Sequence, residues 1–150
     1  MSEQECPFCK IETQGDRILW QNRRFVVILS NPRLMAGHTL VIPRRHVGAP
    51  FELNIFTQIE LLWIVLKWQR KLIRIFSQAW DKPAGCDVSW HTRPFMPQTQ
   101  LSIPGHAHVH LRPRYWSDPY YEAVLKHETP FFQDAKAAER AQMRDLLGEP

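Results

Sequence analysis

The feature that most constrains this chain is a run with histidine at every second position, Gly105-His-Ala-His-Val-His-Leu111. Successive side chains of a β-strand point to opposite faces, so a strand here would place the three imidazoles of His106, His108 and His110 on one face. At about 3.3 Å per residue the outer two Cα atoms would be roughly 13 Å apart, too far to share one small reacting atom. His108 is therefore the predicted centre of direct chemistry, with its neighbours placed to orient, to protonate or to bind a metal.

Imidazole suits chemistry at phosphorus. With an ordinary pKa near 6.5, a histidine is largely uncharged at neutral pH, so its lone pair is available without prior deprotonation. It can attack phosphorus to form a phosphoramidate, which water then cleaves. Two histidines on one strand can instead ligate zinc together. The run by itself is therefore compatible both with catalysis and with a metal site alone.

The sequence predicts neither a membrane span nor an export signal. The longest uninterrupted apolar run, Leu61–Leu66, is far shorter than the roughly 20 residues that a membrane span needs. Acidic residues and a cysteine stand where a signal peptide would be apolar. The length of 150 residues and the hydrophobic content of 44% suit one globular domain. We expect a cytoplasmic protein with a single domain over 1–150, its core over about 6–116 and a C-terminal segment over 117–150.

The hydrophobic pattern predicts an α+β fold. Apolar residues recur at spacings of three, four and seven from Phe51 to about Trp80, which indicates one long helix. A second helix is predicted from about Asp134 to Leu147. Short apolar segments between turn residues predict an antiparallel sheet beside these helices. The recurring helix positions are Ile55, Ile59, Leu62, Leu66, Ile73 and Phe76, and the predicted strands are Arg17–Gln21, Phe25–Leu29, His38–Ile42, Cys86–Trp90 and His106–Leu111.

Carboxylates are missing from two long segments. Lys and Arg number 19 against 15 Asp and Glu, a net charge of +4 that by itself is mild. Yet 17–51 and 88–117 contain no acidic residue, while they hold several arginines and most of the histidines. A general scarcity of glutamate in strands and turns explains this pattern in one way. A bound anion, which a carboxylate would repel, explains it in another.

The cysteines favour a metal or redox pair over disulfides. Three cysteines cannot form a complete set of disulfides within one chain. Cys6 and Cys9 form a C-x-x-C pair, which in a reducing compartment is typical of metal binding or redox activity. Cys86 stands alone and is predicted to be a small buried apolar residue.

Three blocks of sequence together resemble the histidine triad (HIT) family of nucleotide hydrolases and transferases. The histidine run is similar to the family's signature. The stretch 37–47, Gly-His-Thr-Leu-Val-Ile-Pro-Arg-Arg-His-Val, is similar to its upstream strand motif, and Cys6-Pro-Phe-Cys-Lys-Ile11 to its zinc-binding opening. The order and spacing of the blocks also fit, over residues 6 to about 116. The resemblance implies a HIT-like antiparallel sheet of about five strands, with the long helix and a C-terminal helix.

The resemblance also implies roles for individual histidines. In the family a nucleotide is transferred to the middle histidine of the triplet, here His108. His110 would help to bind the scissile phosphate and the leaving group, and His38 would line the same phosphate pocket. Nucleotidyltransferases related to the family carry glutamine at the third triad position. His110 therefore favours water as the acceptor.

Members of the family that bind zinc do so through the C-x-x-C pair, the histidine after the upstream strand motif and the first triad histidine. These correspond to Cys6, Cys9, His46 and His106. Two thiolates and two imidazoles make a closed tetrahedral site, which favours a structural role for the metal. Such a site would tie the N-terminus to the triad strand and hold His108 in position. The alternative is a degenerate site with two buried thiols.

The chain departs from the family's pattern at three places. The stretch 90–104 is longer and lacks the usual polar motif before the triad, so one of Gln98, Thr99, Gln100 and Ser102 is expected to replace the phosphate contacts. Ser30 and Asn31 stand where the family holds the ribose hydroxyls. Arg112 replaces a residue that is usually apolar, and we expect it on the face opposite the histidines or beyond the strand end.

The predicted activity is hydrolysis of a dinucleoside polyphosphate or a nucleoside phosphoramidate through a nucleotidylated His108. One alternative is a zinc- and nucleotide-binding module with little or no turnover, which the altered loop favours; a nucleotidyltransferase is another. A nucleic-acid partner is disfavoured because no added DNA-binding module is present and the charge is modest. A homodimer is implied by the resemblance, with the long helix and 115–121 as candidate contributors.

Overall fold

The computed structural model describes residues 6–80, 82–92, 103, 105–116, 118–128 and 138. The chain divides into two compact units, Met1–Trp116 and Ser117–Pro150, which are described separately. None of the described helices is both long enough and apolar enough to cross a membrane.

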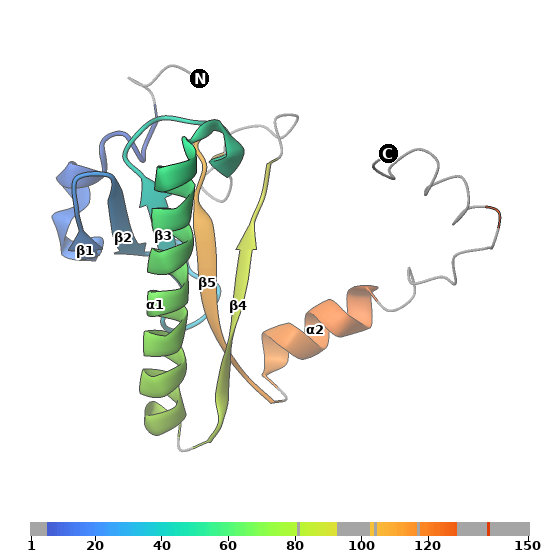
Figure 1. The fold of residues 1–150 in the computed structure, drawn as a ribbon. Coiled ribbons are helices and arrows are strands. Elements are labelled where there is room, and N and C mark those ends of the chain that lie inside the picture. Colours follow the sequence, from blue (N-terminus) through green and yellow to red (C-terminus); the bar gives the residue numbers. More distant parts are fainter. Residues whose placement is uncertain are drawn as a thin grey trace. The chain divides into compact units, whose positions relative to one another are not determined.

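A five-stranded antiparallel sheet forms the centre of the first unit (Figure 1). Its strand order is β1-β2-β3-β5-β4, so the last strand of the chain is inserted between β3 and β4. The predicted α+β class and the number of strands are confirmed. The strands are β1 Ile18–Gln21, β2 Phe25–Leu29, β3 Thr39–Pro43, β4 Ala84–Trp90 and β5 Val109–Tyr115.

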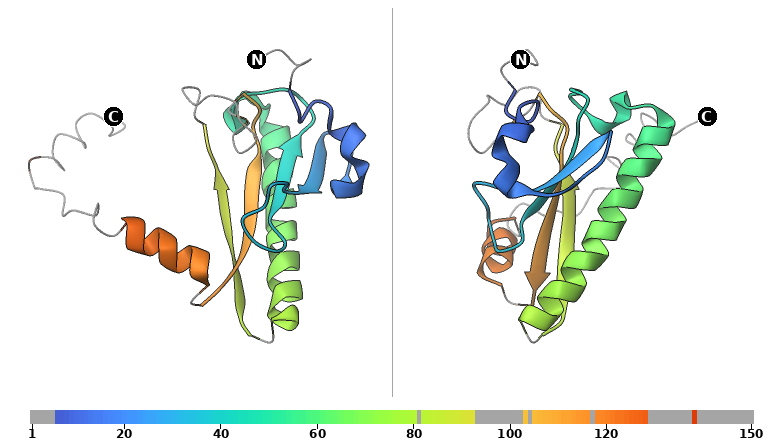
Figure 2. Two further views of the ribbon diagram at one scale, coloured as in Figure 1. Left: turned by 180° about the vertical axis from the view of Figure 1, so that it is seen from behind. Right: turned by 90° about the vertical axis from the view of Figure 1, so that its left-hand side faces the viewer.

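The long helix α1, Ile55–Ala79, covers one face of this sheet, and the short 3-10 helix η2, Ile11–Arg17, lies on the other face (Figure 2). The prediction of a helix from Phe51 to about Trp80 is confirmed except for its first turn. There, a separate 3-10 turn η3 spans Pro50–Glu52, and Asn54 caps the helix by accepting a hydrogen bond from the backbone N–H of Thr57.

The apolar positions whose spacing predicts α1 do not all pack on the sheet. Ile55, Ile59 and Leu62 are 58–60% exposed. The helix is apolar on two faces, and periodicity alone cannot tell which of them meets the sheet. Phe76, which is partly buried, does pack against the core. The residues of α1 that are buried are Thr57, Leu61, Ile64, Val65, Trp68 and Leu72.

Strand β5 begins and ends later than predicted. His106–Leu111 was expected to form the strand and Pro113 to end it, but the strand begins at Val109 and continues to Tyr115. Strand β3 pairs with β5 only as far as Leu111. A proline beyond that point removes no hydrogen bond to β3, so Pro113 is tolerated within the strand.

The second unit contains α2, Pro119–Glu128. Proline is common at the first position of a helix, where its missing N–H is not needed. The side chain of Asp118 accepts a hydrogen bond from the backbone N–H of Tyr121 at 2.8 Å and so caps the first turn. The helix predicted over Asp134–Leu147 falls outside the described residues, apart from position 138, which is helical.

Candidate functional site

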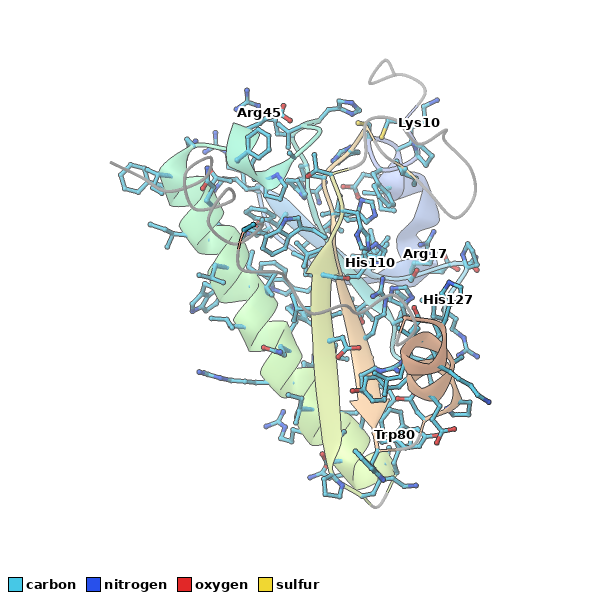
Figure 3. The ribbon with its side chains drawn as sticks, turned by 90° about the vertical axis from the view of Figure 1, so that its right-hand side faces the viewer. Lys10, Arg17, Arg45, Trp80, His110 and His127 are labelled. Atoms are coloured by element: carbon cyan, nitrogen blue, oxygen red, sulfur yellow. The ribbon has the colours of Figure 1, made fainter. Side chains whose placement is uncertain are left out.

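The residues of the histidine run point to alternate sides, although only Val109, His110 and Leu111 of the run lie within β5. Ala107, Val109 and Leu111 belong to the core that α1 covers. The histidines between them face the other side, where a second apolar cluster contains Leu40 and Ile42 of β3. Figure 3 shows His110 beside β5 on the side away from α1. Two separate apolar clusters therefore hold the strand that carries the histidines.

The four predicted metal ligands come together at one end of this face. The Sγ of Cys6 lies 3.3 Å from Nδ1 of His106, and the Sγ of Cys9 lies 3.2 Å from Nδ1 of His46. A tight turn, closed by a hydrogen bond from the N–H of Cys9 to the carbonyl of Cys6, places both sulfurs on one side. The ligand atoms of all four residues lie within 4.8 Å of one another. This arrangement confirms the predicted cluster.

The chemistry of these donors fits Zn²⁺. Nε2 of His106 lies 2.8 Å from the carbonyl oxygen of Pro43, and a carbonyl only accepts, so Nε2 carries the proton. Nδ1 of His106 is thereby left with its lone pair toward the thiols. Burial lowers the pKa of His106 to about 4, which keeps the ring neutral as a metal ligand must be. Two sulfurs and two imidazoles are the donors of closed, tetrahedral zinc sites.

His108 presents a free lone pair beside this cluster. Its Nδ1 lies 2.8 Å from the carbonyl oxygen of His106 and therefore donates the hydrogen bond. Burial lowers the pKa of His108, so the ring is neutral at pH 7 and Nε2 is unprotonated. The ring of Phe8 packs edge-on against His108, with the centroids 5.1 Å apart. A fixed tautomer with an unprotonated Nε2 is what a nucleophilic imidazole requires.

His38 and His110 form a chain of hydrogen bonds with a defined direction. The backbone N–H of Leu34 donates to Nδ1 of His38 at 3.3 Å, so the proton of the neutral ring is on Nε2. That Nε2 lies 3.0 Å from Nδ1 of His110 and donates to it. Nε2 of His110 then carries a proton and is a donor next to His108, whose ring centroid lies 4.8 Å away.

Positive neighbours and burial hold these rings neutral. Burial, together with the nearby Arg112 and His108, lowers the pKa of His38 to about 4. The pKa of His110 falls to about 2 for the same reasons, with His38 and His91 contributing. Among the described residues, no carboxylate contributes to the pKa of either ring. The site therefore favours an anion electrostatically.

Arg112 lies on the histidine face, so the expectation that it would lie on the opposite face or past the strand end is wrong. Residues 110 and 112 are two apart on one strand and share a face. Arg112 acts on the charge of three histidines and donates from Nη1 to the hydroxyl of Ser89 at 3.1 Å. Phe8 was also not singled out from the sequence; its position inside the C-x-x-C loop was the available signal.

Only some of the residues that were predicted to contact the nucleotide lie in the described part of the chain. Ser30 is half-buried, and its hydroxyl donates to the carbonyl of Pro32 at 2.7 Å. Asn31 is exposed in the same loop, which returns to the site because the N–H of Ser30 donates to the carbonyl of His38. Gln98, Thr99, Gln100 and Ser102 lie outside the described residues.

Solved structures with this fold include histidine triad proteins. SMU.412c from Streptococcus mutans is 27% identical, with a TM-score of 0.62 over 97% of this chain and 83% of that chain. A zinc-bound histidine triad family protein from Mycobacterium smegmatis is 22% identical, with a TM-score of 0.52 over 79% and 81%. A HIT family hydrolase from Legionella pneumophila is also 22% identical, with a TM-score of 0.53 over 77% and 98%. No family model and no curated protein matches the chain. The predicted resemblance is nevertheless confirmed in three dimensions: the chain has the fold of the histidine triad family.

Proposed function

We propose that this chain is a nucleotide phosphohydrolase that acts through a nucleotidylated His108. The substrate is a dinucleoside polyphosphate or a nucleoside phosphoramidate. One observation carries the proposal: the hydrogen bond from Nδ1 of His108 to the carbonyl of His106 leaves Nε2 unprotonated, in a cluster of histidines where no described carboxylate raises the pKa of His38 or His110. The likeness to a HIT family hydrolase from Legionella supports the same reaction class.

The first step forms a bond between Nε2 of His108 and the α-phosphorus. The bond from phosphorus to the leaving oxygen or nitrogen breaks and its electron pair departs with the leaving group. A bound phosphate supplies negative charge that raises the pKa of His110. Once protonated beside this charge, His110 gives its Nε2 proton to the leaving group. The ring of His38 lies 3.0 Å from Nδ1 of His110.

Water completes the reaction in the second step. Its oxygen attacks phosphorus while the bond to Nε2 of His108 breaks and returns the electron pair to the ring. The water proton passes to His110, which restores the protonated form needed for the next cycle. The products are a nucleoside monophosphate and the protonated leaving group, so atoms and charge balance.

In this proposal the zinc ion has a structural role. Cys6, Cys9, His46 and His106 would supply four donors to the metal, which would leave no open position for a substrate. The metal would fix residue 106, whose carbonyl holds the nucleophile, and Phe8 of the C-x-x-C loop contacts both His106 and His108. A zinc-bound relative from Mycobacterium supports this assignment.

The test is transfer of a label to the protein. Substrate with a radiolabelled α-phosphate is mixed with the enzyme, the reaction is quenched, and an acid-labile label is mapped to the peptide that contains residue 108. His108→Ala is expected to lose both the label and the turnover while it keeps its melting temperature and its zinc. A label on another residue, or turnover by His108→Ala, would exclude this mechanism. Nucleotide binding without turnover by the wild-type protein would indicate a binding module.

A homodimer is proposed through the outer face of α1. Ile55, Ile59, Leu62, Trp63 and Leu66 are exposed there. Adjacent apolar residues at this density are unusual on the surface of a monomer. Strand β4 is an edge of the sheet, and its Trp90 is 56% exposed. A second copy of the chain offers the same apolar face, as a two-fold interface requires.

A further inference from the structure

Arg112 extends the row of histidines by one more basic side chain. It follows His110 on the same face of β5, about 7 Å further along the strand. Its Nη1 donates to the hydroxyl of Ser89, which stands directly opposite His110 on β4. The guanidinium is thus held at the end of the site that is opposite to the metal cluster.

Within the described part of the chain, the guanidinium of Arg112 has a donor without an acceptor and a charge without a paired carboxylate. Its Nε is buried and has no hydrogen-bond partner within the described part of the chain. Asp87 stands opposite Arg112 in the sheet register, but its carboxylate lies 3.3 Å from Nε of Arg114 and pairs with that arginine. Among the described residues no salt bridge engages Arg112. A buried charged donor without a partner is costly unless a ligand satisfies it.

A phosphate group fits this position. Guanidinium donors match the geometry of phosphate oxygens, and such charge-assisted hydrogen bonds are among the strongest in proteins. The rings on whose charge Arg112 acts, those of His38, His108 and His110, are neutral and so do not repel an anion. A phosphate chain attacked at His108 could continue past His110 toward Arg112.

We propose that Arg112 binds a further phosphate group of the substrate, so that this site selects dinucleoside polyphosphates over nucleoside phosphoramidates. The inference rests on the proposed function. A phosphoramidate carries one phosphate, which His108 and His110 occupy, and has no second anion for Arg112. A polyphosphate carries the additional anions and gains the contact.

The experiment compares two substrates of the same nucleoside in four proteins. Arg112→Met removes the charge, Arg112→Lys keeps it but loses the planar fork, and Arg74→Met removes an exposed charge from α1 on the other side of the sheet. Loss of a charged hydrogen bond corresponds to roughly a 10- to 100-fold loss. We expect kcat/KM for the polyphosphate to fall by that factor in Arg112→Met beyond any fall for the phosphoramidate. Arg112→Lys should recover part of the lost kcat/KM for the polyphosphate. Arg74→Met should keep the wild-type ratio of kcat/KM for the two substrates.

Binding of inorganic pyrophosphate and orthophosphate supplies a readout that needs no turnover. Arg112→Met is expected to lose affinity for pyrophosphate about tenfold more than for orthophosphate. Equal losses for both anions, or for both substrates, would overturn the assignment of Arg112. A wild-type enzyme that cleaves only the phosphoramidate would overturn it as well and leave the hydrolase intact. If neither substrate is cleaved, the hydrolase proposal fails, and the pyrophosphate titration still decides the role of Arg112.

Discussion

Gly37 is the backbone position on which the geometry of the histidine cluster depends. It immediately precedes His38 and has a φ of +76°, in the left-handed region. A Cβ added there would lie 2.3 Å from the ring of Phe76 and 3.1 Å from Cγ of Pro113. Glycine therefore allows the loop to turn and allows α1 and β5 to approach it closely.

The cost of Gly37→Ala follows from these two contacts. Holding a residue with a Cβ in the left-handed region costs about 1–2 kcal/mol. Displacing a packed ring adds about 1–3 kcal/mol, and Phe76 resists because its ring also packs on Trp80, with centroids 4.7 Å apart. Alanine also lowers the conformational entropy of the unfolded chain, which raises the free energy of unfolding by roughly 0.4–1 kcal/mol. The free energy of unfolding should therefore fall by about 1.5–4 kcal/mol.

Urea denaturation of two variants tests this reasoning. Gly85→Ala is the matched control, because Gly85 is exposed in β4 and an added Cβ there has no atom within 4 Å. It should change stability by less than about 1 kcal/mol. Gly37→Asn should be at least as destabilising as Gly37→Ala, because asparagine tolerates the left-handed region but places the same Cβ, and more atoms beyond it, against the ring of Phe76. A Gly37→Ala protein as stable as Gly85→Ala would show that neither the backbone angle nor the ring contact constrains this loop.

Three further predictions concern protons, metal and assembly. Acidification from pH 6.5 toward 4 should lower the free energy of unfolding by up to about 1.4 kcal/mol per pH unit through His38. In the unfolded chain this histidine binds a proton near pH 6.5, whereas in the folded chain its pKa is about 4 and it stays unprotonated. Denaturation of His38→Asn should show a shallower pH dependence; an unchanged one refutes the assignment. Cys9→Ser should reduce bound zinc and the melting temperature, whereas Cys86→Ser, outside the cluster, should keep one zinc per chain by metal analysis. Leu62→Glu should give a monomer by light scattering, while Arg74→Glu on the same helix should not; a monomeric wild-type protein would exclude the interface.

The local pattern predicted the strands well but not their ends. Strand Phe25–Leu29 is found as predicted, because a strand buried on both faces, as this one is except at Leu29, is a continuous apolar run. The end of β5 was missed because it depends on its neighbours. Whether Pro113 breaks the strand is decided by how far β3 extends, and β3 is distant in sequence. The buried face of α1 was missed for a similar reason, since an apolar outer face that a partner could cover looks the same in sequence as a core face.

The metal cluster was predictable because its residue types are rare and their spacing is specific. The hydrogen bonds that make the histidines act as a unit were not predictable. The proton on His38 is placed by the backbone of Leu34, and the proton on His106 by the carbonyl of Pro43. Backbone groups carry no signal in the sequence. The tautomers of the cluster therefore emerge only with the fold.

The register between β3 and β5 determines whether these residues can form a site at all. Leu40 pairs with His110, and His38, two residues before Leu40, lies with its Nε2 3.0 Å from Nδ1 of His110. A slip by one residue would turn the histidines into the core and Val109 toward solvent. Two independent terms oppose the slip: burial of the alternate residues under α1, and the bonds of residue 106 within the metal cluster. Loss of the metal removes only one of them, so the chain should remain folded while the carbonyl that orients His108 loses its anchor.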